Sequence, residues 1–204
     1  MIVLLALASY LWGSIPWGLL IGRWHRGIDL REHGSGNIGL TNALRFLGWK
    51  ATALVFIGDA AKGVVAILLA RWLVGTPTSQ VVAALAAIAG HDFSIFLKFK
   101  GGRGVTTSVA ALAMFFPGVA ALCVVLFLVV VALTRYVSLG SLMGAALSLA
   151  LVVAYYLWGM AVAPHVWFVG IGAPLIWFQH RGNIGRLLQG KERRLGKPVK
   201  AASL

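Results

Sequence analysis

The stretch 105-VTTSVAALAMFFPGVAALCVVLFLVVVALT-134 decides how often this chain crosses a membrane. It is longer than the roughly 20 residues that one membrane helix needs, and Pro117 and Gly118 interrupt it near the middle. The chain as a whole is 60% hydrophobic and only 11% charged, which is typical of transmembrane helices and not of a soluble domain. We therefore expect an all-α integral membrane protein whose number of spans depends on this stretch.

The distribution of basic residues favours two crossings by this stretch. The 204 residues include 18 Lys and Arg against 5 Asp and Glu, and the basic ones gather at 23–45, at 98–103 and in the tail from His180. Because basic loops stay in the cytoplasm, an even number of spans must separate them. A hinge at Pro117-Gly118 gives four spans between the second and third basic segments. We therefore predict seven transmembrane helices, with the N-terminus outside and the C-terminus cytoplasmic.

The remaining apolar runs give the other expected spans. Residues 1–22 have no basic segment before them, so we expect a retained first helix and not a cleaved signal peptide. The other expected spans are residues 46–73, 80–97, 139–158 and 162–179. Because the sequence shows no internal repeat and no soluble segment, residues 1–204 are expected to form a single transmembrane domain.

The polar segment 33-HGSGNIGLTNALR-45, which lies between two apolar runs, is the first candidate anion site. Its glycines allow backbone N–H groups to converge on an anion, and Arg45 adds a planar cation suited to phosphate. From Gly34 onward the segment has no acidic residue that would compete with an anion. We interpret it as a phosphate cradle at the membrane surface, and a turn that only connects two helices is the alternative.

Two further polar segments are expected on the same side of the membrane. Residues 98–107 combine three glycines with three basic side chains, and a helix that starts near Gly104 would add N–H groups to an anion site. In the third segment, His180 and Asn183 lie three residues apart and so share one side of a helix. The alternatives are a plain basic loop and a helix-end histidine without a catalytic role. Together the segments suggest two phosphorylated substrates, one of them amphiphilic.

Several chemistries are disfavoured by what the sequence lacks. No pair of carboxylates has a spacing suited to acid–base catalysis, and the five His residues show no metal-ligand spacing. We therefore expect no metal and no cofactor. Aromatic residues lie in apolar runs and not among the basic ones, so nucleic-acid binding is not expected.

Asp59 and Lys62 lie three residues apart inside the second expected span, where unpaired charges are costly. We expect a structural ion pair that supports the first polar segment, and direct catalysis by Asp59 is the alternative.

The chain closely resembles the bacterial acyl-phosphate:glycerol-3-phosphate acyltransferase family. The matching motifs follow in family order and are 34-GSGNIGLTN-42 with Arg45, Asp59-x-x-Lys62-Gly63, Gly90-His91 with 99-FKGGRGV-105, 135-RYVSL-139, and His180-x-x-Asn183-Ile184-x-Arg186-Leu187 with Gly190 and Glu192. The chain departs from the family at Arg103, where Lys is usual, and at Ser94, where Pro is usual. The resemblance implies seven spans and transfer of a long acyl chain from acyl phosphate to the 1-hydroxyl of glycerol 3-phosphate, giving lysophosphatidate and phosphate.

The resemblance also implies roles for individual residues. The expected catalytic residues are Ser35, Arg45, His180 and Asn183. The expected acyl-phosphate-binding residues are Gly36, Asn37, Gly39, Leu40, Thr41, Asn42 and Ala43. The expected glycerol-3-phosphate-binding residues are Ser35, Arg45, Gly101, Gly102, Arg103, Gly104, Ser141, His180 and Asn183. Glu192 is expected to be structural, like Asp59 and Lys62, and to pair with a nearby Arg.

The expected partners are the two small-molecule substrates and membrane lipid. We expect a monomeric, multi-pass protein of the bacterial inner membrane, with its active site on the cytoplasmic side. The donor phosphate and His180 are both candidates for the proton acceptor. The alternative function is a membrane carrier or flippase for a phosphorylated lipid or sugar phosphate, which would use the same anion cradles.

Overall fold

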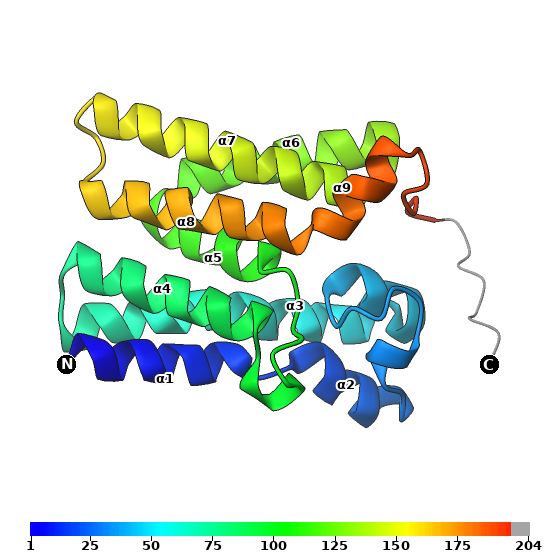
Figure 1. Ribbon diagram of the computed structural model, residues 1–204. Coiled ribbons are helices and arrows are strands. Elements are labelled where there is room, and N and C mark those ends of the chain that lie inside the picture. The colour runs from blue at the N-terminus through cyan, green and yellow to red at the C-terminus, as the bar shows by residue number, and fades with distance from the viewer. Residues whose placement is uncertain (197–204) are drawn as a thin grey trace.

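The computed structural model describes residues 1–196, and its regular elements are all helices (Figure 1). These are α1 Ile2–Ser14, α2 Trp17–Arg26, η1 Leu30–Glu32, α3 Leu40–Leu73, α4 Pro77–Asp92, η2 Ile95–Leu97, α5 Val105–Phe115, α6 Pro117–Thr134, α7 Val137–Leu157, α8 Ala163–Gln179 and α9 Arg181–Leu188. The last residues of the basic tail and of the single expected domain, 197–204, lie outside the described part.

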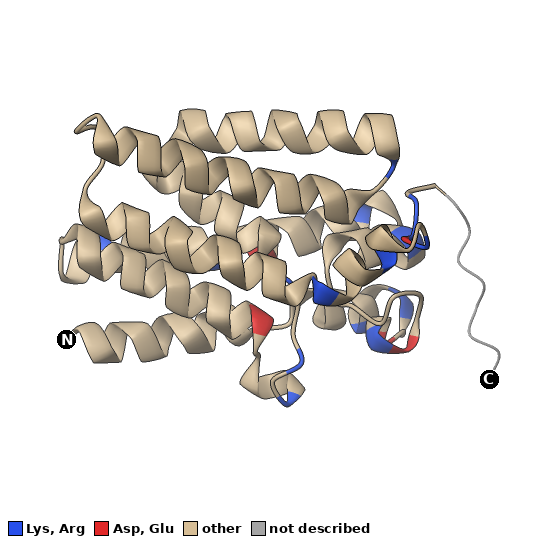
Figure 2. Cartoon of the chain, turned by 45° about the horizontal axis from the view of Figure 1, so that its top comes forward, with Lys and Arg blue, Asp and Glu red and all other residues tan. Residues whose placement is uncertain are grey.

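The long helices lie side by side, and successive ones alternate in direction along the bundle (Figure 1). Helix α4 contacts α1, α3, α5 and α8, while α6 packs on α5 and α7. Within the described residues, five segments are long and apolar enough to cross a membrane, whereas α5 and α8 are shorter. Figure 2 shows that most Lys and Arg lie at the end of the bundle opposite the N-terminus. The prediction of an all-helical membrane protein is therefore confirmed.

The expected division of residues 105–134 is also confirmed. Helix α5 ends at Phe115, and Pro117 is the first residue of α6. Proline suits this position because a helix does not use the N–H of its first residue and because the proline ring fixes φ. Phe116, which precedes the proline, leaves the helical region with φ −140° and ψ 80°. The chain therefore reverses at this residue, and α6 packs back against α5.

The first expected span is present as an apolar segment, Ile2–Arg26, that is long enough to cross a membrane, but the expected single helix is divided into α1 and α2. Pro16 restricts the residue before it, and Ile15 accordingly adopts an extended conformation with φ −60° and ψ 118°. Helix α1 then packs closely on α4 through small residues. A Cβ atom on Gly13 would lie 2.1 Å from the carbonyl oxygen of Ala87, so only glycine allows this approach.

Helix α3 begins earlier than expected. The second span was predicted from residue 46, but the helix begins at Leu40, and the residues up to Arg45 form its first turns. Gly48 interrupts the helix with φ 79° and ψ 173°, a conformation that glycine adopts without a steric penalty. The kink separates these first turns, which carry polar residues, from the long apolar part of α3.

Helix α4 ends at Asp92, before the expected end of the third span at Leu97. Ser94 donates a 2.6 Å hydrogen bond from its hydroxyl to the backbone oxygen of Ser14. This bond joins the loop after α4 to the end of α1, at the break before α2.

The expected buried ion pair between Asp59 and Lys62 is present. Lys62 Nζ lies 2.8 Å from Asp59 Oδ1, and both side chains are almost completely buried. Lys62 also donates a 2.8 Å hydrogen bond to Nδ1 of His91 on α4, so the imidazole carries its proton on Nε2. Thr107 on α5 donates a 2.9 Å hydrogen bond to the backbone oxygen of Asp59. This polar cluster therefore joins α3, α4 and α5 inside an apolar bundle.

Replacing Lys62 by Met tests the contribution of this cluster. The substitution leaves the buried Asp59 carboxylate without its cation, which costs about 3–5 kcal/mol. We expect Lys62→Met to lower the midpoint of thermal unfolding, measured by differential scanning fluorimetry in detergent. The double variant Asp59→Asn/Lys62→Met removes both charges and should recover a large part of this loss. Equal losses in the single and double variants would contradict the ion-pair interpretation.

Candidate active site

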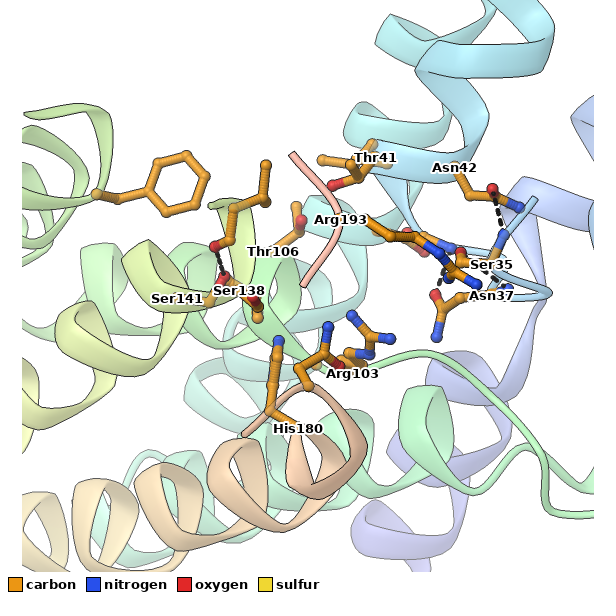
Figure 3. Close-up of a pocket in the computed structure, with 18 of the residues that line it drawn as sticks. Ser35, Asn37, Thr41, Asn42, Arg103, Thr106, Ser138, Ser141, His180 and Arg193 are labelled. Atoms are coloured by element: carbon orange, nitrogen blue, oxygen red, sulfur yellow. Dashed lines mark hydrogen bonds between the residues drawn. The ribbon is translucent and has the colours of Figure 1, made fainter. Parts of the chain in front are cut away.

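A polar pocket of about 180 Å³ lies at the basic end of the bundle. Side chains from the first polar segment, the second polar segment, α7, the α8–α9 junction and the tail converge on it (Figure 3). The expected binding and catalytic residues that line it are Ser35, Asn37, Gly39, Leu40, Thr41, Asn42, Arg45, Arg103, Gly104, Ser141, His180 and Asn183, and the expected structural residues Asp59 and Glu192 line it as well. The three polar segments, which are far apart in the sequence, therefore meet at one cavity.

Four of the expected binding residues do not line this pocket. Ala43 is fully buried in the apolar core between α2 and α3, and Gly36 forms a turn with a positive φ of 69°. Gly101 and Gly102 pack against His91, and a Cβ atom on Gly102 would lie 2.0 Å from the imidazole Nε2. The backbone N–H groups of all four residues donate to other backbone oxygens, and contact of these residues with a ligand stays a prediction. They shape the backbone that carries the lining residues.

Asn42 fixes the first polar segment onto α3. Its side-chain amide donates 3.0 Å hydrogen bonds to the backbone oxygens of Leu30 and His33, and its Oδ1 accepts a 3.1 Å bond from the Ser35 N–H. Gly34 allows this packing, because its φ is 59° and a Cβ atom there would lie 2.5 Å from Asn42 Oδ1. The two donated bonds hold the loop at Leu30 and His33, and the accepted bond orients Ser35.

The N-terminus of α3 borders the same pocket and offers backbone N–H groups to it. The Gly39 N–H donates to Asn37 Oδ1 over 2.8 Å, and the Ala43 N–H is used within the helix. The N–H groups of Leu40 and Thr41, in contrast, have no hydrogen-bond partner in residues 1–196. The first N–H groups of a helix carry partial positive charge and bind anions readily. This end of α3 is therefore suited to a phosphate group.

Three arginines from different segments, Arg45, Arg103 and Arg193, also line the pocket. Burial, together with the positive charges of Arg186 and Arg193, lowers the pKa of Arg103 from its ordinary value. The guanidinium nevertheless stays protonated at neutral pH, because its ordinary pKa is so high. Converging guanidinium groups favour a ligand that carries more than one negative charge.

Glu192, the acid in the tail, is already occupied by protein groups. Its carboxylate accepts a 3.0 Å hydrogen bond from the Ser138 hydroxyl, a 2.8 Å bond from Arg186 Nε and a further bond from the Asn183 amide. The expected pairing of Glu192 with a nearby Arg is therefore present. The carboxylate joins the tail to α7 and α9 and holds Asn183 at the edge of the pocket.

His180 lies between α8 and α9, and only 2% of the surface of this residue is exposed. Its Nδ1 lies 2.8 Å from the backbone oxygen of Ile176. Because a carbonyl oxygen can only accept, Nδ1 carries the proton and Nε2 is left as an acceptor. Burial, opposed by the Ile176 hydrogen bond and reinforced by the Arg103 charge, lowers the pKa of His180 to about 4. The imidazole is therefore uncharged at neutral pH.

Arg193 is a pocket residue that sequence analysis missed. The tail crosses the start of α7, where the Leu195 N–H donates a 2.8 Å hydrogen bond to the backbone oxygen of Arg135. The Arg194 guanidinium lies 5.3 Å from the ring centroid of Tyr136. These contacts direct Arg193 toward the pocket (Figure 3). The many basic residues of the tail could have indicated an anion-binding residue there. The positive-inside rule, however, explains the same basic residues by membrane topology alone.

An apolar groove of about 240 Å³ adjoins the polar pocket. The two cavities share the lining residues Leu40, Val105, Thr106, Phe127 and Ser141, so one continues into the other. The groove runs between α5, α6, α7 and α8, and its walls are apolar except for a few hydroxyl groups. The groove has no signal in the sequence, because hydropathy does not reveal which faces of four apolar helices stay apart.

The cation-lined pocket continues into an apolar groove, so this membrane protein has room for a ligand with an anionic headgroup and a lipid chain. A family model described as "Glycerol-3-phosphate acyltransferase" matches residues 3–190. The chain belongs to this family, and it is a membrane acyltransferase. The resemblance seen in the sequence motifs is therefore confirmed.

Individual relatives are similar over almost the whole chain. The glycerol-3-phosphate acyltransferase of Desulforudis audaxviator is 45% identical over 195 residues, which cover 95% of each chain. That of Thermus thermophilus is 44% identical over 203 residues, which cover 96% of each chain. The crystal structure of PlsY (YgiH), an integral membrane glycerol 3-phosphate acyltransferase in its glycerol 3-phosphate form, matches with a TM-score of 0.87 and 35% identity over 96% of both chains.

The uncharged state of His180 is expected to give a distinct titration. In NMR spectra of protein with labelled histidine rings, the His180 signal should titrate with a midpoint near pH 4, because burial disfavours the imidazolium. The His180→Asn variant loses this signal and so assigns it. Added inorganic phosphate should raise the midpoint, since a bound anion offsets the charge of Arg103. A midpoint near the ordinary histidine value of about 6.5 in the free protein would contradict this description.

Proposed function

We propose that this protein transfers a fatty acyl group from acyl phosphate to the 1-hydroxyl of sn-glycerol 3-phosphate, giving lysophosphatidate and phosphate, the first step of phospholipid synthesis. The observation that carries the proposal is the continuity of the cation-lined pocket with the apolar groove. The acceptor, a small polar phosphate ester, needs only the pocket. The donor and the product each combine a phosphate with a long chain, so they need both cavities. Membership of the acyltransferase family agrees with this assignment.

The two phosphate groups occupy different parts of the polar pocket in this proposal. The donor phosphate binds at the N-terminus of α3, where the N–H groups of Leu40 and Thr41 lack protein partners within the described chain. Glycerol 3-phosphate binds among side chains from the other pocket segments, which are Ser35, Arg45, Arg103, Ser141, His180 and Asn183. Arg193 adds a further cation between these sites. Catalysis then consists mainly of holding two anions close together, which the arginine charges make favourable.

The acyl chain of the donor extends into the groove between α5, α6, α7 and α8. Thr106 and Ser141, which line both cavities, mark the level at which the reacting carbonyl lies. A related PlsY (YgiH) structure in its lysphosphatidic acid form matches this chain with a TM-score of 0.85 and 36% identity. That ligand combines a phosphate headgroup with an acyl chain, which supports the two-cavity arrangement.

The reaction proceeds by direct transfer between the two substrates. The oxygen of the 1-hydroxyl attacks the carbonyl carbon of acyl phosphate, a new ester bond forms, and the bond from that carbon to the phosphate oxygen breaks. Phosphate leaves with the electron pair of the broken bond. The hydroxyl proton passes to an oxygen of the donor phosphate, because the low pKa of His180, about 4, makes it a weak base at neutral pH. The Nε2 atom of His180 accepts a hydrogen bond from the hydroxyl and orients it.

The chain crosses the membrane seven times in this proposal, with α1 and α2 together forming the first span. The alternating directions of the helices in Figure 1 support this count. The concentration of Lys and Arg at one end of the bundle in Figure 2 supports a cytoplasmic location for that end, for the active site and for the tail. The N-terminus is then outside, and the protein acts as a monomer and a single domain in the bacterial inner membrane. The pocket is lined mainly by loops and helix ends from the basic end of the bundle, which disfavours the alternative of a carrier or flippase.

Purified protein with palmitoyl phosphate and glycerol 3-phosphate tests the proposed activity directly. We expect lysophosphatidate and phosphate to form in equal amounts in the presence of EDTA, and we expect palmitoyl-CoA not to replace the donor. Mass spectrometry of the lipid product measures both. Failure to form lysophosphatidate from acyl phosphate, with uptake of a phosphorylated lipid into vesicles instead, would favour a carrier.

The His180→Ala variant distinguishes the two candidate proton acceptors. If the donor phosphate accepts the proton, kcat should fall by less than about a hundredfold, the lower end of what a general base contributes. The acidic limb of the pH–rate profile should keep its position, since that limb reports the protonation of the essential base, which in this proposal is not His180. A larger fall together with a displaced profile would identify His180 as the base.

A further inference from the structure

Gly172 on α8 is buried, yet it faces empty space. A Cβ atom built on it would meet no atom within 4 Å, although the residue is among the buried residues of the helix. Buried glycines in closely packed bundles normally face a neighbouring backbone, as Gly13 does against Ala87. The space in front of Gly172 is the apolar groove, which this residue lines together with Ala173 and Ile176.

The position of Gly172 along the groove follows from helix geometry. His180 marks the polar end, and Gly172 precedes it by two turns, or about 12 Å at 1.5 Å per residue. On the opposite wall, Ser148 lies about 10 Å beyond Ser141, which borders both cavities. An acyl chain whose carbonyl lies at the shared residues therefore passes Gly172 only if it is long. We expect an octanoyl chain to end before this level and a palmitoyl chain, which is twice as long, to continue past it.

We propose that Gly172 determines acyl-chain selectivity: the missing side chain keeps the far part of the groove open and so admits long-chain donors. The inference rests on the proposed acyltransferase function and adds the residue that sets chain length. A branched side chain at position 172 would fill the groove at this depth, because nothing else occupies the space in front of the Cβ position. Donors that end before this level would keep all their contacts, and the polar pocket would be unchanged.

The test is a competition assay with octanoyl phosphate and palmitoyl phosphate mixed in equal amounts with glycerol 3-phosphate. The readout is the ratio of the two lysophosphatidate products, which does not depend on the amount of folded protein. We expect Gly172→Leu to shift this ratio toward the octanoyl product by about tenfold or more, since overfilling a packed apolar site is strongly disfavoured. Gly172→Ala should shift the ratio in the same direction by a smaller factor.

Gly170→Leu is the matched control. Gly170 lies on the same helix, is exposed, and also has no atom within 4 Å of its Cβ position, but it does not line the groove. The control therefore has the same change in side chain and in helix propensity, and its product ratio should equal that of the wild type. Ser148→Leu narrows the groove from α7 and should reproduce the shift seen with Gly172→Leu, so it replaces that variant if it fails to fold.

The outcomes distinguish a failure of the role assigned to Gly172 from a failure of the proposed acyltransferase function. A wild-type product ratio in Gly172→Leu, Gly172→Ala and Ser148→Leu would overturn the assignment of Gly172, and so would an equal shift in Gly170→Leu. Absence of both products with the folded wild-type protein would instead overturn the proposed function. A shift confined to the groove variants supports the assignment.

Discussion

The structure depends on holding several positive charges together beside an apolar membrane interior. Arg45, Arg103 and Arg193 line a pocket in which the tail carboxylate, Glu192, is already bonded to three protein groups. Repulsion among these arginines is offset when an anion binds, so the same arrangement that costs stability in the free protein favours phosphate. The apolar groove next to the pocket then restricts that anion to one that carries, or accepts, a lipid chain.

Each polar segment that forms the pocket is fixed by one buried polar anchor. Asn42 holds the first segment through three hydrogen bonds. His91, bonded to Lys62 and packed against Gly102, supports the second. Glu192 joins the third to α7. Because buried polar groups are costly when unpaired, these anchors favour one arrangement of each segment. The lining residues are therefore held in position before substrates bind, as catalysis by proximity and orientation requires.

The sequence predicts the broad architecture because its strongest signals are local and additive. The division at Pro117 follows from segment length, a proline and the parity of basic loops, and each of these can be read without tertiary structure. The break at Pro16 was missed because the flanking residues are as apolar as a continuous span. The early start of α3 at Leu40 was missed because a polar, glycine-containing stretch resembles a loop. Arg193 and the groove were missed because both depend on how distant helices pack, and neither has a local pattern.

If arginines from distant segments jointly hold the phosphate of the acceptor, removing one of them must weaken the binding of glycerol 3-phosphate, which calorimetric titration of purified protein measures. Arg45→Ala should weaken binding by about 2–5 kcal/mol, the usual loss for a desolvated charge pair. Arg181→Ala is the control, because Arg181 is exposed, contacts Phe178 and does not line the pocket. We expect the control variant to bind glycerol 3-phosphate with wild-type affinity. Equal affinities for Arg45→Ala and the wild type, or equal losses in both variants, would contradict joint binding by the arginines.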